Sequence, residues 1–230
     1  MSRKRVVVLL SGNGSTLQAL IDQQPDSHYD IVGVFSNRPG VFGLQRAARA
    51  NIPHCTINHQ DFSDRGTFDQ HMLQSIDQLN PDYVVLAGYM RILSSDFIRH
   101  FSGRLINIHP SLLPKHKGLN TYQNALALGD REHGTTVHFV TDELDSGAII
   151  LQASLPVHPV DTVQTLEQRV KAMEQKIYPL AVDCLCSGRL IGKDSVVWLD
   201  NHPLPKQGYL LQEKNLDQQC QRLSIKPSRA

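Results

Sequence analysis

The sequence has few cysteines, no long apolar run and no excess of one charge. Its 230 residues include only four cysteines, and these are Cys55, Cys184, Cys186 and Cys220. They form neither a C-x-x-C pair nor the dense framework of a small disulfide-stapled domain. The cysteine content therefore disfavours a secreted disulfide scaffold and predicts a reducing, cytoplasmic environment.

Charge and hydropathy exclude two further classes of partner. The 23 basic and 22 acidic residues nearly cancel, so the chain lacks the basic surface that nucleic acid or an acidic membrane would need. The apolar run 6–10 is too short for a signal peptide or a membrane span, and Ser11 and Gly12 follow it at once. Small-molecule chemistry is the better prediction, with no nucleic acid or membrane as partner.

Short apolar runs alternate with longer amphipathic stretches, which is typical of βα units around a mostly parallel sheet. The pattern predicts an α/β fold: one Rossmann-like domain over 1–208, with about seven strands and helices on both faces, and a flexible polar tail over 209–230. Expected strands lie near 5–10, 30–36, 54–57, 83–87, 105–108, 135–140 and 148–155, and expected helices near 15–22, 43–50, 66–79, 95–101, 121–128 and 162–187. The last two strands are joined by a loop too short for a crossover helix, so we expect an antiparallel edge. Residues 196–199 suggest a small additional hairpin.

Three polar residues stand out near strand ends. Asn107 and His109 are two apart at the end of an expected strand that stops at Pro110, so their side chains share one face. Asp145 lies in a turn-forming stretch before Ser146 and is free to fold over that pair. An amide donor, an imidazole and a carboxylate together suit oxyanion stabilisation and proton transfer. The alternative is a satisfied structural histidine, of which a chain with 11 histidines has ample choice.

A glycine-containing loop links the first expected strand to the first helix. Gly14, Ser15 and Thr16 open that helix, where free backbone N–H groups and the helix dipole favour an anion. The loop lacks the third glycine of a dinucleotide site and the Gly-Lys-Ser/Thr ending of an ATP site. It predicts a phosphate-binding loop, and a purely structural turn is the alternative.

The segment 88–93 follows the fourth expected strand at the carboxyl end of the sheet, where open α/β sheets bind ligands. It suits a flat heterocycle, although from this segment alone the preferred interpretation is that Met90, Ile92 and Leu93 belong to the core. The simplest interpretation of His133 is a residue in a surface turn, and that of His138 is a structural residue of a strand. No histidine or cysteine spacing matches a zinc site, so no metal is expected.

Taken together, the glycine loop, the segment 88–93, the Asn-Ile-His-Pro-Ser-Leu-Leu-Pro stretch at 107–114 and the stretch 133–145 resemble the phosphoribosylglycinamide formyltransferases. These are folate-dependent enzymes of purine synthesis, and the resemblance extends from about residue 5 to residue 208. It implies formyl transfer from 10-formyltetrahydrofolate to the amine of glycinamide ribonucleotide, without a metal, by a monomer or homodimer.

The resemblance also implies roles for individual residues. Asn107, His109 and Asp145 would be catalytic. Gly14, Ser15 and Thr16 would hold the substrate phosphate and Glu174 the glycinamide amine, although the family often has Asn at the position of Thr16. The folate would be bound by Arg65, Met90, Arg91, Ile92, Leu93 and Asn107.

Two related branches fit the sequence less well. The methionyl-tRNA branch usually continues its motif towards Arg-Gly-Ala-Ala-Pro and adds a C-terminal RNA-binding domain, for which we expect 230 residues to leave no room. The hydrolase branch adds an N-terminal regulatory domain, whereas the first expected strand here begins at residue 5.

Two further activities remain as alternatives. A nucleotide-sugar formyltransferase would use the same triad with another amine. A non-catalytic phosphosugar-binding module would use only the glycine loop.

Overall fold

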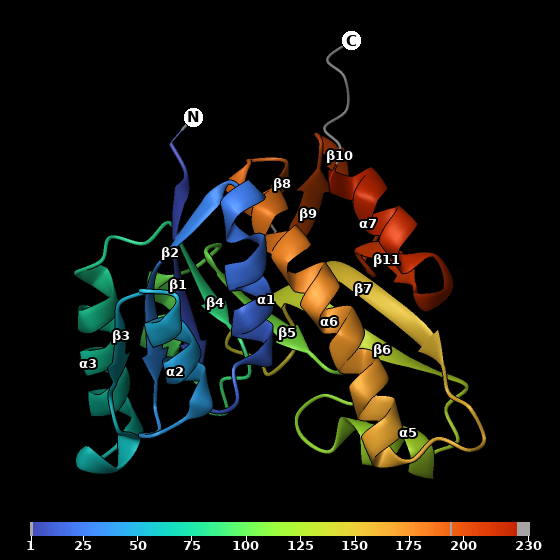
Figure 1. Ribbon diagram of the computed structural model, residues 1–230, viewed down its shortest axis with the longest axis horizontal. Helices are drawn as coiled ribbons and strands as arrows, with labels where there is room; N and C mark the ends of the chain where they lie inside the picture. The colour runs from blue at the N-terminus through green and yellow to red at the C-terminus, as the bar shows by residue number, and fades with distance from the viewer. Residues whose placement is uncertain (1, 194, 225–230) are drawn as a thin grey trace. The chain divides into compact units, whose positions relative to one another are not determined.

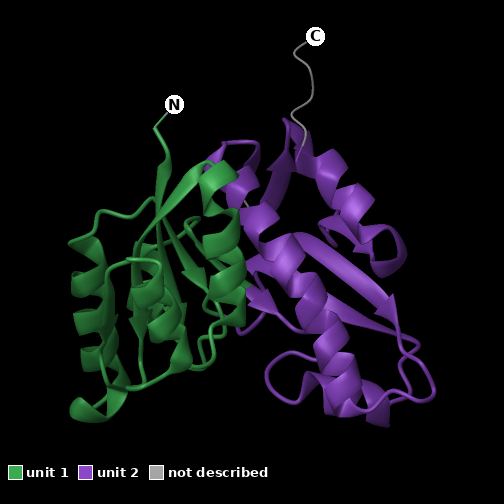
Figure 2. Cartoon of the chain, in the orientation of Figure 1, with its two compact units in different colours: residues 1–107, 140–142 green, residues 108–139, 143–230 purple. Residues whose placement is uncertain are grey.

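The computed structural model describes residues 2–193 and 195–224 (Figure 1). Their contacts divide the chain into two compact units, one formed by residues 1–107 and 140–142 and the other by residues 108–139 and 143–230 (Figure 2). We call these unit 1 and unit 2. The boundary falls inside strand β5 (Leu105–His109), between Asn107 and the residue that follows it.

Unit 1 is built on a parallel sheet with the strand order β3-β2-β1-β4-β5. Its strands besides β5 are β1 (Lys4–Leu10), β2 (Tyr29–Ser36), β3 (His54–Thr56) and β4 (Tyr83–Leu86). Its helices are α1 (Ser15–Gln23), α2 (Phe42–Arg49), α3 (Arg65–Asp77) and α4 (Ser95–His100), with short 3₁₀ turns η1 (Gln24–Asp26) and η2 (His59–Asp61).

Both faces of this sheet are covered because apolar side chains occupy successive positions of β1. Val7 and Leu9 belong to one core cluster together with Phe68 and Met72 of α3. Leu10 points to the other face, where the start of α2 approaches it so closely that a side chain at Gly43 would collide with it. Burial of β1 on both sides explains its continuous apolar run, as parallel sheets require.

Unit 2 contains the antiparallel pair β6 (Glu132–Phe139) and β7 (Ile149–Pro156), and β11 (Tyr209–Gln212) runs parallel to β7. A small antiparallel sheet is formed by β8 (Leu190–Lys193), β9 (Val196–Leu199) and β10 (His202–Pro203). The helices are α5 (Thr121–Ala127), α6 (Val163–Cys186) and α7 (Leu216–Ser224), with the 3₁₀ turn η3 (Glu213–Asn215). Figure 1 shows the long α6 lying across β6 and β7.

Helix α6 carries the apolar stripe that the sequence predicts. Leu166, Val170 and Ile177 are fully buried, as their spacing of four and seven residues requires of one helix face. The helix begins after Thr162, whose hydroxyl accepts the backbone N–H of Thr165. The capping box is completed by the Thr165 side chain and not by a Glu or Gln.

The expected α/β class is confirmed, with a mostly parallel sheet, surrounding helices and an antiparallel strand pair. All seven expected strands and six expected helices are present within one to three residues of their predicted ends, and the expected hairpin is β8–β9. Strand β11 was not expected. The domain boundary at residue 208 stays a prediction.

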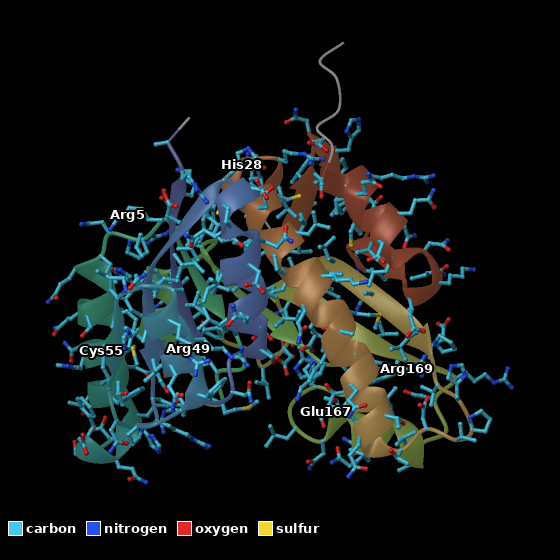
Figure 3. All side chains as sticks on the ribbon, viewed as in Figure 1. Arg5, His28, Arg49, Cys55, Glu167 and Arg169 are labelled. Carbon is cyan, nitrogen blue, oxygen red and sulfur yellow. The ribbon has the colours of Figure 1, made fainter. Side chains whose placement is uncertain are left out.

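The expectation of a flexible tail is wrong for residues 209–224, which form β11, η3 and α7. Leu211, Leu216 and Leu223 are buried, and Arg169 of α6, labelled in Figure 3, is ion-paired to Glu213 at 2.9 Å. So few apolar anchors in a polar sequence give too weak a periodicity to predict. The rest of the expected tail, residues 225–230, lies outside the described residues.

Candidate active site

The predicted imidazole and carboxylate meet in unit 2. The Nδ1 atom of His109, at the end of β5, lies 3.4 Å from Oδ2 of Asp145, and both side chains are only 7% exposed. The other ring nitrogen, Nε2, donates to the carbonyl oxygen of His116 at 2.8 Å. Both ring nitrogens therefore face oxygen acceptors, which fixes the orientation of the imidazole.

Backbone geometry and a hydrogen bond orient Asp145. The residue adopts the left-handed conformation, with φ 48°, and its Oδ2 accepts the backbone N–H of Gly118 at 2.8 Å. Asp and Asn tolerate this conformation better than most residues, which explains an acid at a turn that precedes Ser146 and Gly147. The carboxylate is therefore fixed towards His109 by its own turn and by the loop 116–118.

A second histidine, His138 of β6, lies on the far side of the same carboxylate. Its Nε2 is 3.7 Å from Oδ1 of Asp145, and its Nδ1 donates to the carbonyl of Phe139 at 2.8 Å. Burial lowers the pKa of His138, which holds the ring neutral. A neutral His138 leaves the negative charge of Asp145 to act on His109.

Two threonines of β6 hold the strand end and the loop that follow His109. The Thr135 hydroxyl donates to the carbonyl of His109 at 3.0 Å. The Thr136 hydroxyl donates to the carbonyl of Ser111 at 2.6 Å and accepts the N–H of Leu113 at 3.1 Å. These hydrogen bonds fix the backbone that carries the His109 imidazole and the loop that follows it.

Glu174 of α6 reaches the same region of unit 2. The side chain is buried, and one carboxylate oxygen lies 3.4 Å from the Thr135 hydroxyl. Burial raises the pKa of Glu174 to about 7, although the charge of Lys171 and the hydrogen bond from Thr135 act against the shift. A carboxyl with that pKa can exchange a proton with a bound amine near neutrality.

The loop that supplies the His116 carbonyl is itself anchored by a hydrogen bond to Asp130. Nε2 of His116 lies 2.6 Å from Oδ2 of Asp130, and this hydrogen bond is the main reason why the pKa of Asp130 is lowered. His133 packs edge-on against the His116 ring, with 5.9 Å between centroids. His133 is buried within β6, so the interpretation of it as a surface-turn residue is wrong, and burial lowers its pKa to about 4.

The predicted phosphate loop lies in unit 1, where the start of α2 closes around it. Gly14 has a φ of 74°, and a Cβ atom there would lie 2.6 Å from the Cα of Gly43, so this position requires glycine. Arg46 braces the neighbouring residue by donating to the backbone and side-chain oxygens of Asn13, both at 3.0 Å. Ser15 and Thr16 begin α1, whose N-terminus has no side-chain cap, so N–H groups of the first turn are available to an anion.

The predicted folate segment, residues 90–93, also lies in unit 1. Met90 and Ile92 are 60% and 61% exposed, so the alternative that they belong to the core is wrong, whereas Leu93 is buried in the core as that alternative holds. The Arg91 guanidinium stacks 4.9 Å from the centroid of the Phe68 ring. Arg65 is exposed at the start of α3 and Asn107 is partly exposed on β5.

Sequence reasoning missed the roles of His138 and of the His116 carbonyl. His138 is a buried strand residue, as expected, but nothing in its spacing shows that the turn carrying Asp145 returns to it. His116 contacts His109 through its backbone carbonyl, which every residue has, so no sequence pattern marks this contact. Among residues 2–193 and 195–224, no group of three or more His, Cys, Asp or Glu side chains is arranged to hold a metal ion.

Comparison with known proteins decides the family. The sequence profile of the family described as Formyl transferase matches residues 4–182. The chain is 49% identical over 210 residues to the phosphoribosylglycinamide formyltransferase of Escherichia coli, a match that covers 90% of this chain and 99% of that one. The chain belongs to the phosphoribosylglycinamide formyltransferase family.

Further members of this family agree in sequence and in structure. The phosphoribosylglycinamide formyltransferase of Haemophilus influenzae is 46% identical over 208 residues, covering 90% of this chain and 98% of its own. The solved structure of the phosphoribosylglycinamide formyltransferase of Coxiella burnetii superimposes with a TM-score of 0.88 at 47% identity, and covers 91% of this chain and 100% of its own. No helix of the described residues is long and apolar enough to cross a membrane.

Proposed function

We propose that the chain transfers the formyl group of 10-formyltetrahydrofolate to the amine of glycinamide ribonucleotide, a step of purine biosynthesis. The observation that carries the proposal is the His109–Asp145 pair, in which a buried imidazole has an oxygen acceptor at each nitrogen. It occurs within the Asn-Ile-His-Pro motif of a chain that belongs to this family. The family supplies the substrates, and the pair supplies the acid/base chemistry.

In the proposed reaction the amine nitrogen attacks the formyl carbon and forms a tetrahedral intermediate. The amide of Asn107 and an N–H of His109 stabilise its oxyanion. The bond between the formyl carbon and N10 of the folate then breaks, and the proton lost by the amine ends on N10, relayed by His109. Because Nε2 of His109 donates to the His116 carbonyl in this structure, we expect the ring to exchange that contact for the substrate.

We assign substrate binding to the residues that the family resemblance implies. The ribose phosphate is bound by the backbone of Gly14, Ser15 and Thr16, for which the uncapped start of α1 gives support. Glu174 binds the glycinamide amine and takes a proton from its ammonium form, because a nucleophilic amine must be neutral. The folate is bound by Arg65, Met90, Arg91, Ile92, Leu93 and Asn107.

We propose that the reaction takes place in the cytoplasm, since the four cysteines are all free thiols in the structure and suit a reducing compartment. The oligomeric state, either a monomer or a homodimer, stays a prediction. We further propose that the reaction needs no metal, because an N-formyl group is already an activated acyl donor.

The function is tested by giving the purified chain several acceptors together with 10-formyltetrahydrofolate labelled in the formyl group. Glycinamide ribonucleotide should become labelled, whereas methionyl-tRNA and amino-sugar nucleotides should not. Preferential labelling of either alternative acceptor would replace the proposed function with another formyl transfer. Absence of transfer to every acceptor would favour a non-catalytic phosphosugar-binding module.

A further inference from the structure

Ser11 connects the glycine loop to the start of the segment 90–93. The backbone N–H of Met90 donates to the Ser11 hydroxyl oxygen at 2.8 Å, and the backbone N–H of Ser11 donates to the carbonyl of Gly88 at 3.1 Å. One residue therefore bonds both sides of the turn 88–90. The turn cannot shift relative to the glycine loop without breaking a hydrogen bond at a buried position.

The Ser11 hydroxyl is fully engaged inside the protein. It donates to the side-chain oxygen of Asn37 at 2.5 Å while it accepts from Met90. Ser11 and Asn37 are 4% and 1% exposed. Although Ser11 is the first residue of the glycine loop, its hydroxyl serves the segment 90–93 and not an anion bound by the loop.

Asp69 of α3 holds the other end of the same segment. Its Oδ2 accepts the backbone N–H of Ser94 at 2.5 Å, and the Asp69 side chain is almost completely buried. Burial raises the pKa of Asp69, while hydrogen bonds from Ser94 and the positive charges of Arg91 and Arg65 act in the opposite direction. The carboxylate thus fixes the backbone directly after Leu93 and attracts Arg91 electrostatically.

Between these two ends Leu93 packs in the core and Arg91 stacks on the Phe68 ring, but the remaining side chains hold the segment less firmly. The Tyr89 hydroxyl and Nε of Arg91 are buried without a hydrogen-bond partner among the described residues, and Met90 and Ile92 are exposed. The backbone bonds to Ser11 and Asp69 add to this packing by fixing both ends of the segment. A ligand that binds to the backbone or to the exposed side chains of residues 90–93 therefore depends on these two hydrogen bonds.

We propose that Ser11 and Asp69 are positioning residues for the folate, which hold the two ends of Met90–Leu93 and so set the affinity for 10-formyltetrahydrofolate. The inference rests on the proposed function, because it takes residues 90–93 as folate-binding. Neither residue touches the reacting atoms. Each acts by lowering the conformational freedom that the segment would lose when the folate binds.

The test compares Ser11→Ala and Asp69→Asn with the parent and with Ser75→Ala, a control in α3 whose exposed hydroxyl bonds only to the carbonyl of His71. We measure KM for each substrate, kcat, and the Kd of 10-formyltetrahydrofolate in the absence of glycinamide ribonucleotide. We expect the folate KM and Kd to rise about 5- to 100-fold in both variants, as the loss of a buried hydrogen bond predicts. KM for glycinamide ribonucleotide should change less than about twofold, and the control should match the parent.

If Ser11→Ala does not fold, Asn37→Ala tests the same contact. It removes the acceptor of the Ser11 hydroxyl and leaves Ser11 in place. It should raise the folate KM in the same direction and by a smaller factor. A parent without formyl transfer would overturn the proposed function and this inference with it. An active parent whose folded variants keep the parental folate KM, or raise the KM of both substrates equally, would overturn the inference alone.

Discussion

Asp145 lies 3.4 Å from His109 on one side and 3.7 Å from His138 on the other, so one carboxylate separates two buried imidazoles. The two rings differ in their other partners. His138 donates a hydrogen bond from Nδ1 to the backbone carbonyl of Phe139, and burial lowers its pKa so that the ring is neutral. Both ring nitrogens of His109, by contrast, face oxygen atoms. The same carboxylate therefore lies between a neutral imidazole and an imidazole whose two nitrogens both face oxygen atoms.

Replacing Asp145 with Asn keeps the size of the side chain but removes the carboxylate that lies 3.4 Å from His109. We expect kcat for formyl transfer to fall about 30- to 1,000-fold, the range for loss of a group that stabilises transition-state charge by ~2–4 kcal/mol. Steady-state kinetics across pH 6–9 measure the effect. Asp142→Asn, at an exposed position of the same connection, is the control, and a variant within threefold of the parent at every pH would remove Asp145 from the mechanism.

Gly14→Ala tests the phosphate loop through backbone shape. The new Cβ would lie 2.6 Å from the Cα of Gly43 in a residue with a φ of 74°, so we expect the loop to shift and KM for glycinamide ribonucleotide to rise at least tenfold. Gly40→Ala is the matched control, because Gly40 has a φ of 69° but no atom within 4 Å of its Cβ position. An unchanged KM in a folded Gly14→Ala enzyme would show that the loop does not bind the phosphate.

Glu174→Gln should change the pH dependence of stability. Burial raises the pKa of Glu174 from 4.5 to about 7, so the folded state binds a proton more tightly than the unfolded state between those values. The parent is therefore destabilised as pH rises from 4.5 to 7, by on the order of 3 kcal/mol at about 1.4 kcal/mol per pH unit. Glutamine cannot ionise, so the variant should gain stability relative to the parent across this window and keep that gain above pH 7.

Urea unfolding of both proteins at pH 5 and pH 8 measures the Glu174 effect. Glu167→Gln, on the same helix but partly exposed and labelled in Figure 3, should leave the difference between the two pH values unchanged. The Glu174 variant should also lose kcat/KM for glycinamide ribonucleotide, because the amine loses its proton acceptor. A Glu174→Gln stability gain of equal size at both pH values would show that the carboxyl does not titrate in this window.

Formyl transfer should survive exhaustive chelation. The N-formyl donor is already electrophilic, and in the proposed mechanism His109 and Asp145 supply the acid/base chemistry without a Lewis acid. The measurement is the initial rate before and after incubation with excess chelator and gel filtration. A rate that collapses and then returns with one particular divalent ion would establish a metal requirement.

Sequence alone predicted the order of strands and helices well because each element has one dominant local signal. The buried run of β1, the stripe of α6 and the glycine turn before α1 are all visible in periodicity or composition. The prediction for residues 209–224 failed because three buried leucines in a polar stretch give no periodic pattern. Contacts with residues far away in the sequence order this segment.

The residues of the candidate site also fall into those that a sequence pattern marks and those that it does not. His109 and Asp145 could be predicted because a motif and a family resemblance mark their side chains. His116 could not, since it contributes a backbone carbonyl that any residue would carry. The roles proposed here for Ser11 and Asp69 were equally hidden, because each depends on a backbone N–H 79 or 25 residues away in the sequence.

The most direct test of the account is the single-turnover rate of formyl transfer to glycinamide ribonucleotide in the parent, His109→Gln, Asp145→Asn and the double variant. If Asp145 acts through His109, the parent transfers the formyl group, each single variant is slower by at least tenfold, and the double variant is about as slow as His109→Gln alone. A parent that does not formylate glycinamide ribonucleotide, or a double variant whose loss equals the product of the two single losses, would contradict the account.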